Sequence, residues 1–220
     1  MKRRYFGSIR NAPKILIVPG LTDSGPDHWQ TYWERDLPRC RKVELGKWDD
    51  PHRNTWVNRL NLAIERAGSR VILVAHSLGC HAVAWWAEYE RPKVGGPVVG
   101  ALLVAPPEVE GSNVDPRIAR FAPVMPNRFP FLSIVAASSN DPYIEFGRAR
   151  KLARVWGSRF VDAGPLGHIN ADSGIRDWPY GRYLLDRLKE AITPHPDPIV
   201  RRGAFETFMQ GGKPELVIGR

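Results

Sequence analysis

The sequence predicts an α/β fold, in which a parallel sheet is covered by helices on both faces. Short and uniformly apolar runs, typical of strands buried on both sides, alternate with longer segments in which apolar residues recur at helical spacing. Repeated alternation of this kind favours right-handed crossovers between parallel strands. The length of 220 residues is compatible with one such domain and a sizeable core.

The apolar runs are the expected strands, and they lie at residues 14–20, 41–46, 70–76, 96–106, 129–138 and 158–164. The clearest helix covers 54–68, where Trp56, Leu60 and further apolar residues fall on one stripe and Gly68 is placed to end the helix. Further helices are expected at 27–36, 79–90, 145–156 and 178–191.

The chain divides into a central domain and two terminal segments. We expect the α/β domain to cover 14–192, with a basic extension at 1–13 and a partly ordered or partner-binding appendage at 193–220, where prolines and glycines gather. Within the domain, the proline-rich segment 106–130 has no clean period. We expect this segment to lie beside the carboxyl edge of the sheet, where loops carry function.

Composition argues against several classes of protein. A formal charge of +9 would suit a nucleic-acid-binding protein, but beyond the first ten residues basic side chains are interspersed with carboxylates. We therefore expect no nucleic acid as a partner. No apolar stretch approaches the ~20 residues of a membrane span, so no membrane association is expected. The only cysteines, Cys40 and Cys80, form no CxxC motif, and we expect a cytoplasmic protein.

A serine follows the third apolar run in the stretch Ala75-His76-Ser77-Leu78-Gly79. A serine on a sharp strand-to-helix turn has its hydroxyl exposed at the sheet edge where ligands bind in α/β folds. This nucleophile elbow usually reads G-x-S-x-G, because strand and helix nearly touch there. Alanine replaces the first glycine here and adds one methyl group. Taken alone, the serine is ordinarily no more than a helix N-cap.

A serine hydroxyl becomes a nucleophile only when a base removes its proton. In this type of fold the partners follow in the chain order serine, acid, histidine. Asp141 follows the fifth apolar run and His168 the sixth, so we expect both at the same sheet edge as Ser77. Each residue alone fits a turn or loop, but their shared order and topology predict a Ser-Asp-His triad.

Other titratable residues fit these roles less well. Asp115 lies in the proline-rich segment and Asp162 lies inside the last apolar run. His76 directly precedes the serine and is expected to point away from it. No histidines are spaced as an i,i+4 metal-binding pair, so we expect neither a metal site nor a cofactor.

An oxyanion hole needs two hydrogen-bond donors. One expected donor is the backbone N–H of Leu78, at the start of the helix after the serine, where N–H groups and the helix dipole favour an anion. The other should come from the loop after the first apolar run, where Gly20 allows close approach. We assign it to the backbone N–H of Leu21.

Several separate stretches resemble one family. They include "ILIVPGLTDSGPDHWQTYWERDLP", "VILVAHSLGCHAVAWWA", "SNDPYIEFGRARKLARVWGSRF" and "GHINADSGIRDWPYG". They are similar to the small α/β-hydrolases typified by retinoblastoma-binding protein nine and the bacterial YdeN proteins, over about residues 14–190. The resemblance implies a triad of Ser77, Asp141 and His168, esterase-like chemistry and no large lid domain. It leaves the natural substrate undefined.

Together these observations predict a serine hydrolase with a six-stranded parallel sheet in the order 2-1-3-4-5-6. It would cleave a small acyl ester, or a related acyl bond, through an acyl-enzyme on Ser77. The alternative is a hydrolase-fold protein whose main role is to bind a protein partner, and the oligomeric state stays open. One or two of the tryptophans are expected to line the cleft, and the others to pack in the core, out of the set Trp29, Trp48, Trp56, Trp85, Trp86 and Trp178.

Overall fold

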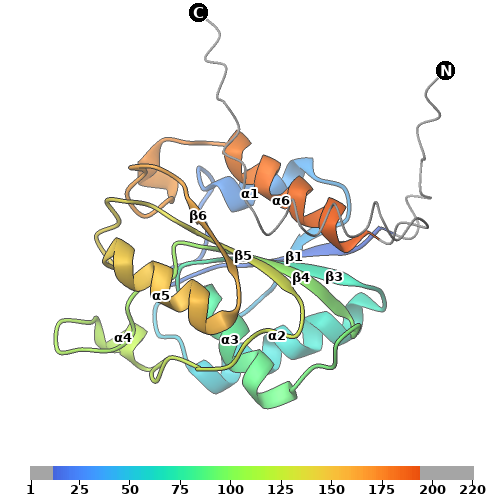
Figure 1. Ribbon diagram of the computed structural model, residues 1–220, viewed down its shortest axis with the longest axis horizontal. Helices are drawn as coiled ribbons and strands as arrows, with labels where there is room; N and C mark the ends of the chain where they lie inside the picture. Colours follow the sequence, from blue (N-terminus) through green and yellow to red (C-terminus); the bar gives the residue numbers. More distant parts are fainter. Residues whose placement is uncertain (1–11, 194–220) are drawn as a thin grey trace, which may run out of the picture.

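A parallel β-sheet runs through the part of the chain that the structure, a computed structural model, describes, residues 12–193 (Figure 1). Its six strands have the order β2-β1-β3-β4-β5-β6, which confirms the predicted topology. All neighbouring strands are parallel. The strands are β1 (Lys14–Val18), β2 (Cys40–Lys42), β3 (Val71–His76), β4 (Val98–Val104), β5 (Leu132–Ala137) and β6 (Arg159–Asp162).

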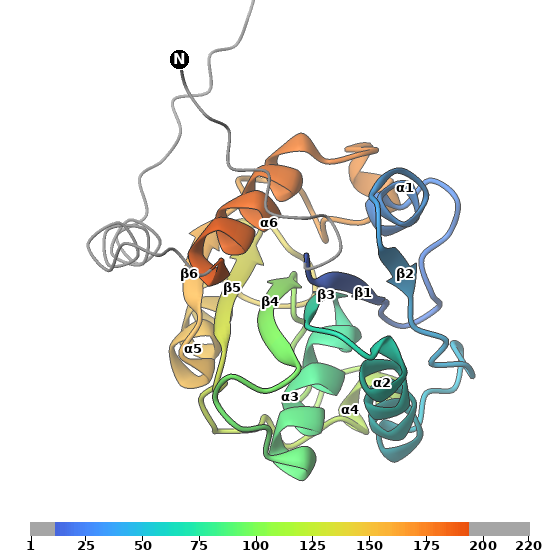
Figure 2. The same ribbon diagram turned by 90° about the vertical axis from the view of Figure 1, so that its right-hand side faces the viewer.

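Helices cover both faces of the sheet, as predicted (Figures 1 and 2). On one face lie α1 (Trp29–Asp36) and α6 (Pro179–Ile192). On the other face lie α2 (Arg53–Ala67), α3 (Leu78–Glu90) and α5 (Phe146–Trp156). Within residues 12–193 no separate lid domain occurs, and the predicted proline-rich segment contains only the short helix α4 (Pro116–Ala119). The predicted extension and appendage lie almost entirely outside the described residues.

The predicted second strand is shorter than expected. The run 41–46 was predicted as a strand, but β2 ends at Lys42. The Val43 N–H still donates to Ile17 of β1 at 2.8 Å, whereas the Leu45 N–H turns back to the carbonyl of Val43 at 3.0 Å. This tight turn ends the pairing of the edge strand with β1.

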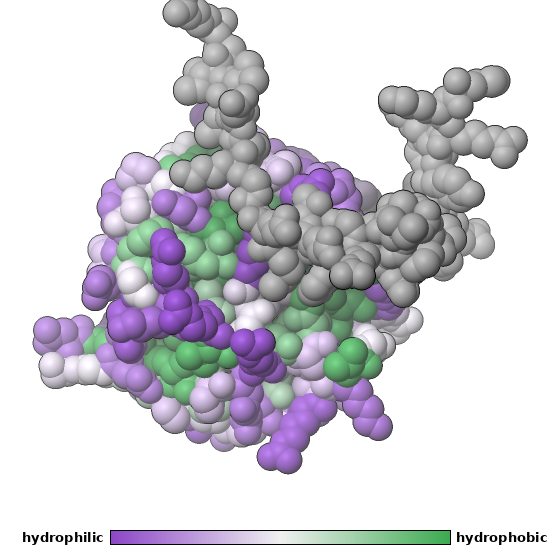
Figure 3. Space-filling view, viewed as in Figure 1, coloured by the Kyte–Doolittle hydropathy of each residue, from purple (hydrophilic) through white to green (hydrophobic). Residues whose placement is uncertain are grey.

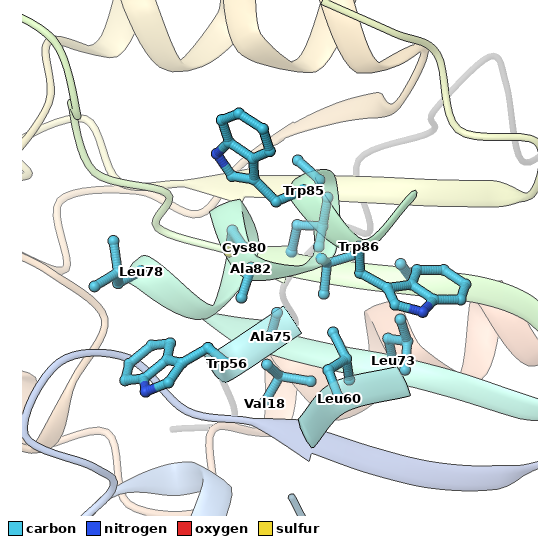
Figure 4. Packing of buried hydrophobic residues seen from close by; sticks show 14 of the residues in the cluster. Val18, Trp56, Leu60, Leu73, Ala75, Leu78, Cys80, Ala82, Trp85 and Trp86 are labelled. Carbon is cyan, nitrogen blue, oxygen red and sulfur yellow. The ribbon is translucent and has the colours of Figure 1, made fainter. Parts of the chain in front are cut away.

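Alternate side chains of the strands enter two separate cores. In β3, Leu73 and Ala75 belong to the core that contains the side chains of α2, α3 and α5. Ile72 and Val74 belong to the core on the opposite face, with α1 and α6. Every residue of β3 is therefore buried, as expected for a parallel strand covered on both sides. Figure 4 shows part of the first of these cores, in which Trp56 of α2, Leu78 of α3 and Ala75 of β3 are among the labelled side chains.

The outer surface mixes polar and apolar regions. On the face seen in Figure 3, hydrophobic patches are separated by a band of hydrophilic side chains. No helix among residues 12–193 has the length and apolar character needed to cross a membrane.

The start of α3 lies directly against the end of β1. A Cβ added to Gly79, the second residue of α3, would lie 2.4 Å from the carbonyl oxygen of Val18 and 2.5 Å from that of Pro19. Both oxygens belong to the backbone and cannot move aside without distorting the end of β1. Only glycine therefore lets the helix begin this close to the strand.

We predict that Gly79→Ala lowers the free energy of unfolding by about 1–3 kcal/mol, the usual cost of overpacking. Gly147 provides a matched control because it is also the second residue of its helix, α5. A Cβ there would meet only a side-chain oxygen of Glu145, at 3.3 Å. Gly147→Ala should therefore be neutral or stabilise by up to about 1 kcal/mol. Urea unfolding followed by circular dichroism measures both variants, and equal losses would contradict the packing argument.

Candidate active site

Ser77 forms the sharp turn between β3 and α3. Its φ of 52° and ψ of −127° lie outside the regions that non-glycine residues usually adopt, a strain of order 1–3 kcal/mol. The turn is held because the Ser77 N–H donates to the carbonyl of Val104 and the Cys80 N–H donates to that of Ser77, both at 2.9 Å. Ala75, where the motif usually has glycine, is fully buried in the core beside α3, so its methyl group is accommodated. The turn presents the hydroxyl at the carboxyl edge of the sheet.

His168 and Asp141 reach Ser77 from two separate loops. His168 Nε2 lies 2.8 Å from Ser77 Oγ, and His168 Nδ1 lies 3.0 Å from each carboxylate oxygen of Asp141. An ionised carboxylate can only accept hydrogen bonds, so Nδ1 carries the hydrogen and Nε2 of the neutral ring accepts from the serine hydroxyl. The side chain of Asp141 is 1% exposed and that of His168 is 9% exposed. The residues predicted from the sequence are thus brought together in hydrogen-bonding order.

The loop after β5 holds the loop that carries His168. Ser138 Oγ accepts from the Leu166 N–H at 2.9 Å, and Asn140 Oδ1 accepts from the Gly167 N–H at 2.7 Å. Ser138 Oγ also donates to Asn140 Oδ1 at 2.8 Å. Sequence reasoning missed both residues, although the polar run directly after an apolar strand is the signal that points to them.

Two aromatic side chains hold the same loop through its carbonyl groups. His76 Nε2 donates to the His168 carbonyl at 2.9 Å, and Trp29 Nε1 donates to the Ile169 carbonyl at 2.8 Å. We expected His76 only to point away from the serine. Its contact with the main chain of His168 was not foreseen, because it depends on how the β6 loop returns to β3. The His168 backbone is therefore fixed by side chains from several elements.

The rival carboxylates are engaged elsewhere. Asp115 accepts from the N–H of Arg117 at the start of α4 and forms an ion pair with the Arg117 guanidinium at 2.7 Å. Asp162 accepts from the Gly164 N–H at 2.8 Å. Both therefore stabilise local turns.

The predicted oxyanion donors belong to the start of α3 and to the loop after β1. Leu78 is the first residue of α3, where helical N–H groups have no partner within the helix. Leu21 lines the cavity beside Ser77. Its loop lies so close to Ser77 that a Cβ on Gly20 would be only 2.7 Å from Ser77 Cβ. The next N–H along this loop, that of Thr22, donates to the carbonyl of Trp48 at 3.0 Å.

A cavity of about 500 Å³ opens beside Ser77 and His168. Its walls come from the loop between β1 and α1, from the segment around α4, and from the turn after β6. The proline-rich segment 106–130 thus lies at the carboxyl edge, as expected. The expectation that one or two tryptophans line the cleft is wrong for this cavity, because they pack in the cores instead. Those that are buried are Trp29, Trp56, Trp85, Trp86 and Trp178, while Trp48 is half-buried.

Buried histidines near the site stay neutral. Burial, with a smaller effect of the nearby His168, lowers the pKa of His28 to about 4. Burial, with smaller effects of His28 and His168, holds the pKa of His76 well below its usual value. Because His28 and His76 are neutral, they do not repel a positive charge that forms on the His168 ring. Burial also raises the pKa of the Cys80 thiol, which leaves it a poor nucleophile one turn beyond Ser77.

These lowered values predict that the free energy of unfolding falls as the pH drops from about 6.5 to 4. In that interval histidines of the unfolded chain bind protons that the buried rings do not. His81, whose pKa burial lowers to about 4, provides the test. In His81→Gln an amide can still donate to the Pro107 carbonyl, which the ring contacts at 2.9 Å, and the decline should shrink by about 1–3 kcal/mol. Denaturant titrations at several pH values measure it, and His52→Gln, at a side chain 55% exposed, should match the parent. An unchanged decline in His81→Gln would contradict the prediction.

Within residues 12–193, no group of three or more His, Cys, Asp or Glu side chains is arranged to hold a metal ion.

Comparison with known proteins places the chain in a family. A family model described as serine hydrolase matches residues 15–187. A YdeN-like hydrolase from Pectobacterium atrosepticum is 31% identical, with a TM-score of 0.72 over 84% of this chain and 95% of the other. The ydeN gene product of Bacillus subtilis is 21% identical, with a TM-score of 0.64 over 80% and 98%.

More distant structures share the fold. Carboxylesterase CesB of Bacillus subtilis is 12% identical, with a TM-score of 0.53 over 80% of this chain and 84% of the other. No curated protein matches the sequence. On the family match and the YdeN-like structure, the chain belongs to the serine hydrolase family, as a YdeN-like member of the α/β-hydrolase superfamily.

Proposed function

We propose that the protein is an esterase-like hydrolase that cleaves small acyl esters through an acyl-enzyme on Ser77. The observation that carries the proposal is the hydrogen-bonded series from Asp141 through His168 to Ser77, with distances of 3.0 and 2.8 Å. The strained turn at Ser77 supports it, since backbone strain is concentrated at functional sites. The adjoining cavity supports it because it gives a substrate access to the hydroxyl.

Acylation begins when His168 Nε2 takes the proton of the Ser77 hydroxyl while Oγ bonds to the acyl carbon. Asp141 accepts the hydrogen bond from Nδ1–H throughout, which fixes the ring and stabilises the imidazolium that forms. His168 then gives its proton to the oxygen of the departing alcohol. The alcohol leaves, and the acyl group remains on Ser77.

The negative oxygen of the tetrahedral intermediate is stabilised by the N–H groups of Leu78 and Leu21. Loss of one such donor typically costs about 2.7–4 kcal/mol of transition-state stabilisation. In deacylation His168 removes a proton from a water molecule, whose oxygen attacks the acyl carbon, and then returns the proton to Ser77 Oγ. These steps draw only on side chains, backbone donors and water.

Ser77→Ala tests the nucleophile. We expect the parent protein to react with a fluorophosphonate probe and to hydrolyse p-nitrophenyl acetate, whereas the variant should do neither above the buffer rate. Mass spectrometry of the probe-labelled peptide identifies the modified residue, and circular dichroism checks the fold. Turnover that persists in Ser77→Ala would refute the assignment.

Asp141→Asn tests the acid. An amide in place of the carboxylate can stabilise the wrong tautomer of His168, and the comparable change in a serine protease lowers kcat about ten-thousand-fold. Asp162→Asn is a matched control, since Asp162 is the last residue of the neighbouring strand β6 and its carboxylate accepts from the Gly164 N–H in its own turn. It should keep kcat within about threefold of the parent. A large loss in Asp162→Asn with none in Asp141→Asn would exchange the roles of the two residues.

A further inference from the structure

Two buried polar atoms beside the candidate active site have no hydrogen-bond partner among the described residues. They are Asp23 Oδ1 and His28 Nε2. Both residues line the cavity that also contains Ser77 and His168. Buried polar atoms are nearly always paired, so two unpaired atoms in one cavity wall indicate that something else completes their hydrogen bonds.

The two atoms have complementary hydrogen-bonding roles. His28 Nδ1 accepts from the Gln30 N–H at 3.1 Å at the start of α1, so in the neutral ring Nε2 carries the hydrogen and is a donor. Asp23 Oδ2 accepts from Lys42 Nζ at 2.7 Å, which leaves Oδ1 as an acceptor. The carboxylate is near enough to raise the pKa of His28 slightly against the larger effect of burial, although the two groups form no ion pair with each other.

The loop that carries Asp23 is held in an unfavourable conformation. Thr22 and Asp23 both have φ of 65°, a region that non-glycine residues seldom occupy. The Thr22 N–H donates to Trp48, and the Lys42 side chain of β2 holds the carboxylate. Strain of this kind is typical of segments that position a group for a ligand.

The charges around the cavity are balanced. Asp23 is paired with Lys42, and on the α4 side Asp115 is paired with Arg117 at 2.7 Å. The residues that form the wall therefore carry polar atoms but little net charge. A neutral polar group fits this environment better than an ion, and a purely apolar chain would leave both atoms unpaired.

We propose that Asp23 Oδ1 and His28 Nε2–H bind a hydroxyl or carboxamide group of a neutral acyl substrate. Such a group can donate to the carboxylate and accept from the imidazole at the same time. Because both atoms are covered in the free protein, binding involves a small movement of the surrounding side chains, which is common at binding sites. The inference rests on the proposed hydrolase function and adds the class of substrate to it.

The test compares esters that differ only by a hydroxyl in place of a methyl group. On the acyl side the pair is p-nitrophenyl 3-hydroxybutyrate and p-nitrophenyl 3-methylbutyrate. On the alcohol side the pair is 2-hydroxyethyl acetate and propyl acetate, followed by acid release. The parent protein should prefer the hydroxylated member of at least one pair by about tenfold or more in kcat/KM, since a site built to hydrogen-bond a hydroxyl rejects the analogue that lacks it.

Variants then separate recognition from structure. His28→Asn keeps a side-chain acceptor for the start of α1 but loses the Nε2 donor, so the preference should fall to within about twofold of unity. His28→Gln places an amide N–H near the Nε2 position and should keep part of the preference. Asp23→Leu should abolish the preference for the hydroxylated ester. Lys42→Met removes the same ion pair but leaves Asp23 Oδ1 in place, so it should keep the preference.

The outcomes distinguish this inference from the proposed function. If the parent shows no Ser77-dependent hydrolysis of any ester, the proposed function fails and the substrate assignment fails with it. If the parent hydrolyses p-nitrophenyl acetate but both ester pairs react within about twofold of each other, only the substrate assignment is overturned. It is also overturned if His28→Asn and Lys42→Met lose the preference equally, because the role of the two side chains would then be structural.

Discussion

The site depends on how closely the start of α3 approaches the end of β1. Gly79 allows the approach, since any side chain there would meet the carbonyl oxygens of Val18 and Pro19. Gly20 allows the next loop to pass within reach of Ser77. Between these contacts Ser77 adopts a backbone conformation that is costly for a serine. The packing of the sheet and helices holds the strained turn and aims the hydroxyl outward.

The site also depends on the parallel sheet, because the loops that follow its strands meet at one edge. The loops after β5 and β6 are joined to each other by Ser138 and Asn140, while His76 and Trp29 hold the main chain around His168 from the other side. The imidazole position is therefore set by bonds to its backbone as well as by Asp141. Burial keeps His76 neutral, so it can hold the loop without repelling a charge on the His168 ring.

The strand order and the meeting of Ser77, Asp141 and His168 could be predicted, because the apolar runs and the order of these residues along the chain can be read directly from the sequence. The contacts of His76, Ser138 and Asn140 could not, since they depend on how two loops pack against each other. The prediction that one or two tryptophans line the cleft was wrong for a related reason. Composition does not distinguish an indole packed in the core from one that lines a cleft. The unpaired atoms of Asp23 and His28 likewise become visible only when every neighbouring donor and acceptor is located.

The most direct test of the account is a crystal structure of the protein after reaction with a small alkylphosphonate ester, whose phosphorus mimics the tetrahedral carbon. The account predicts a covalent bond from Ser77 Oγ to phosphorus, with the phosphonyl oxygen accepting hydrogen bonds from the backbone N–H groups of Leu78 and Leu21. His168 Nε2 should lie within hydrogen-bonding distance of the adduct. A phosphonyl group on another residue, or one whose oxygen faces away from both N–H groups, would contradict it.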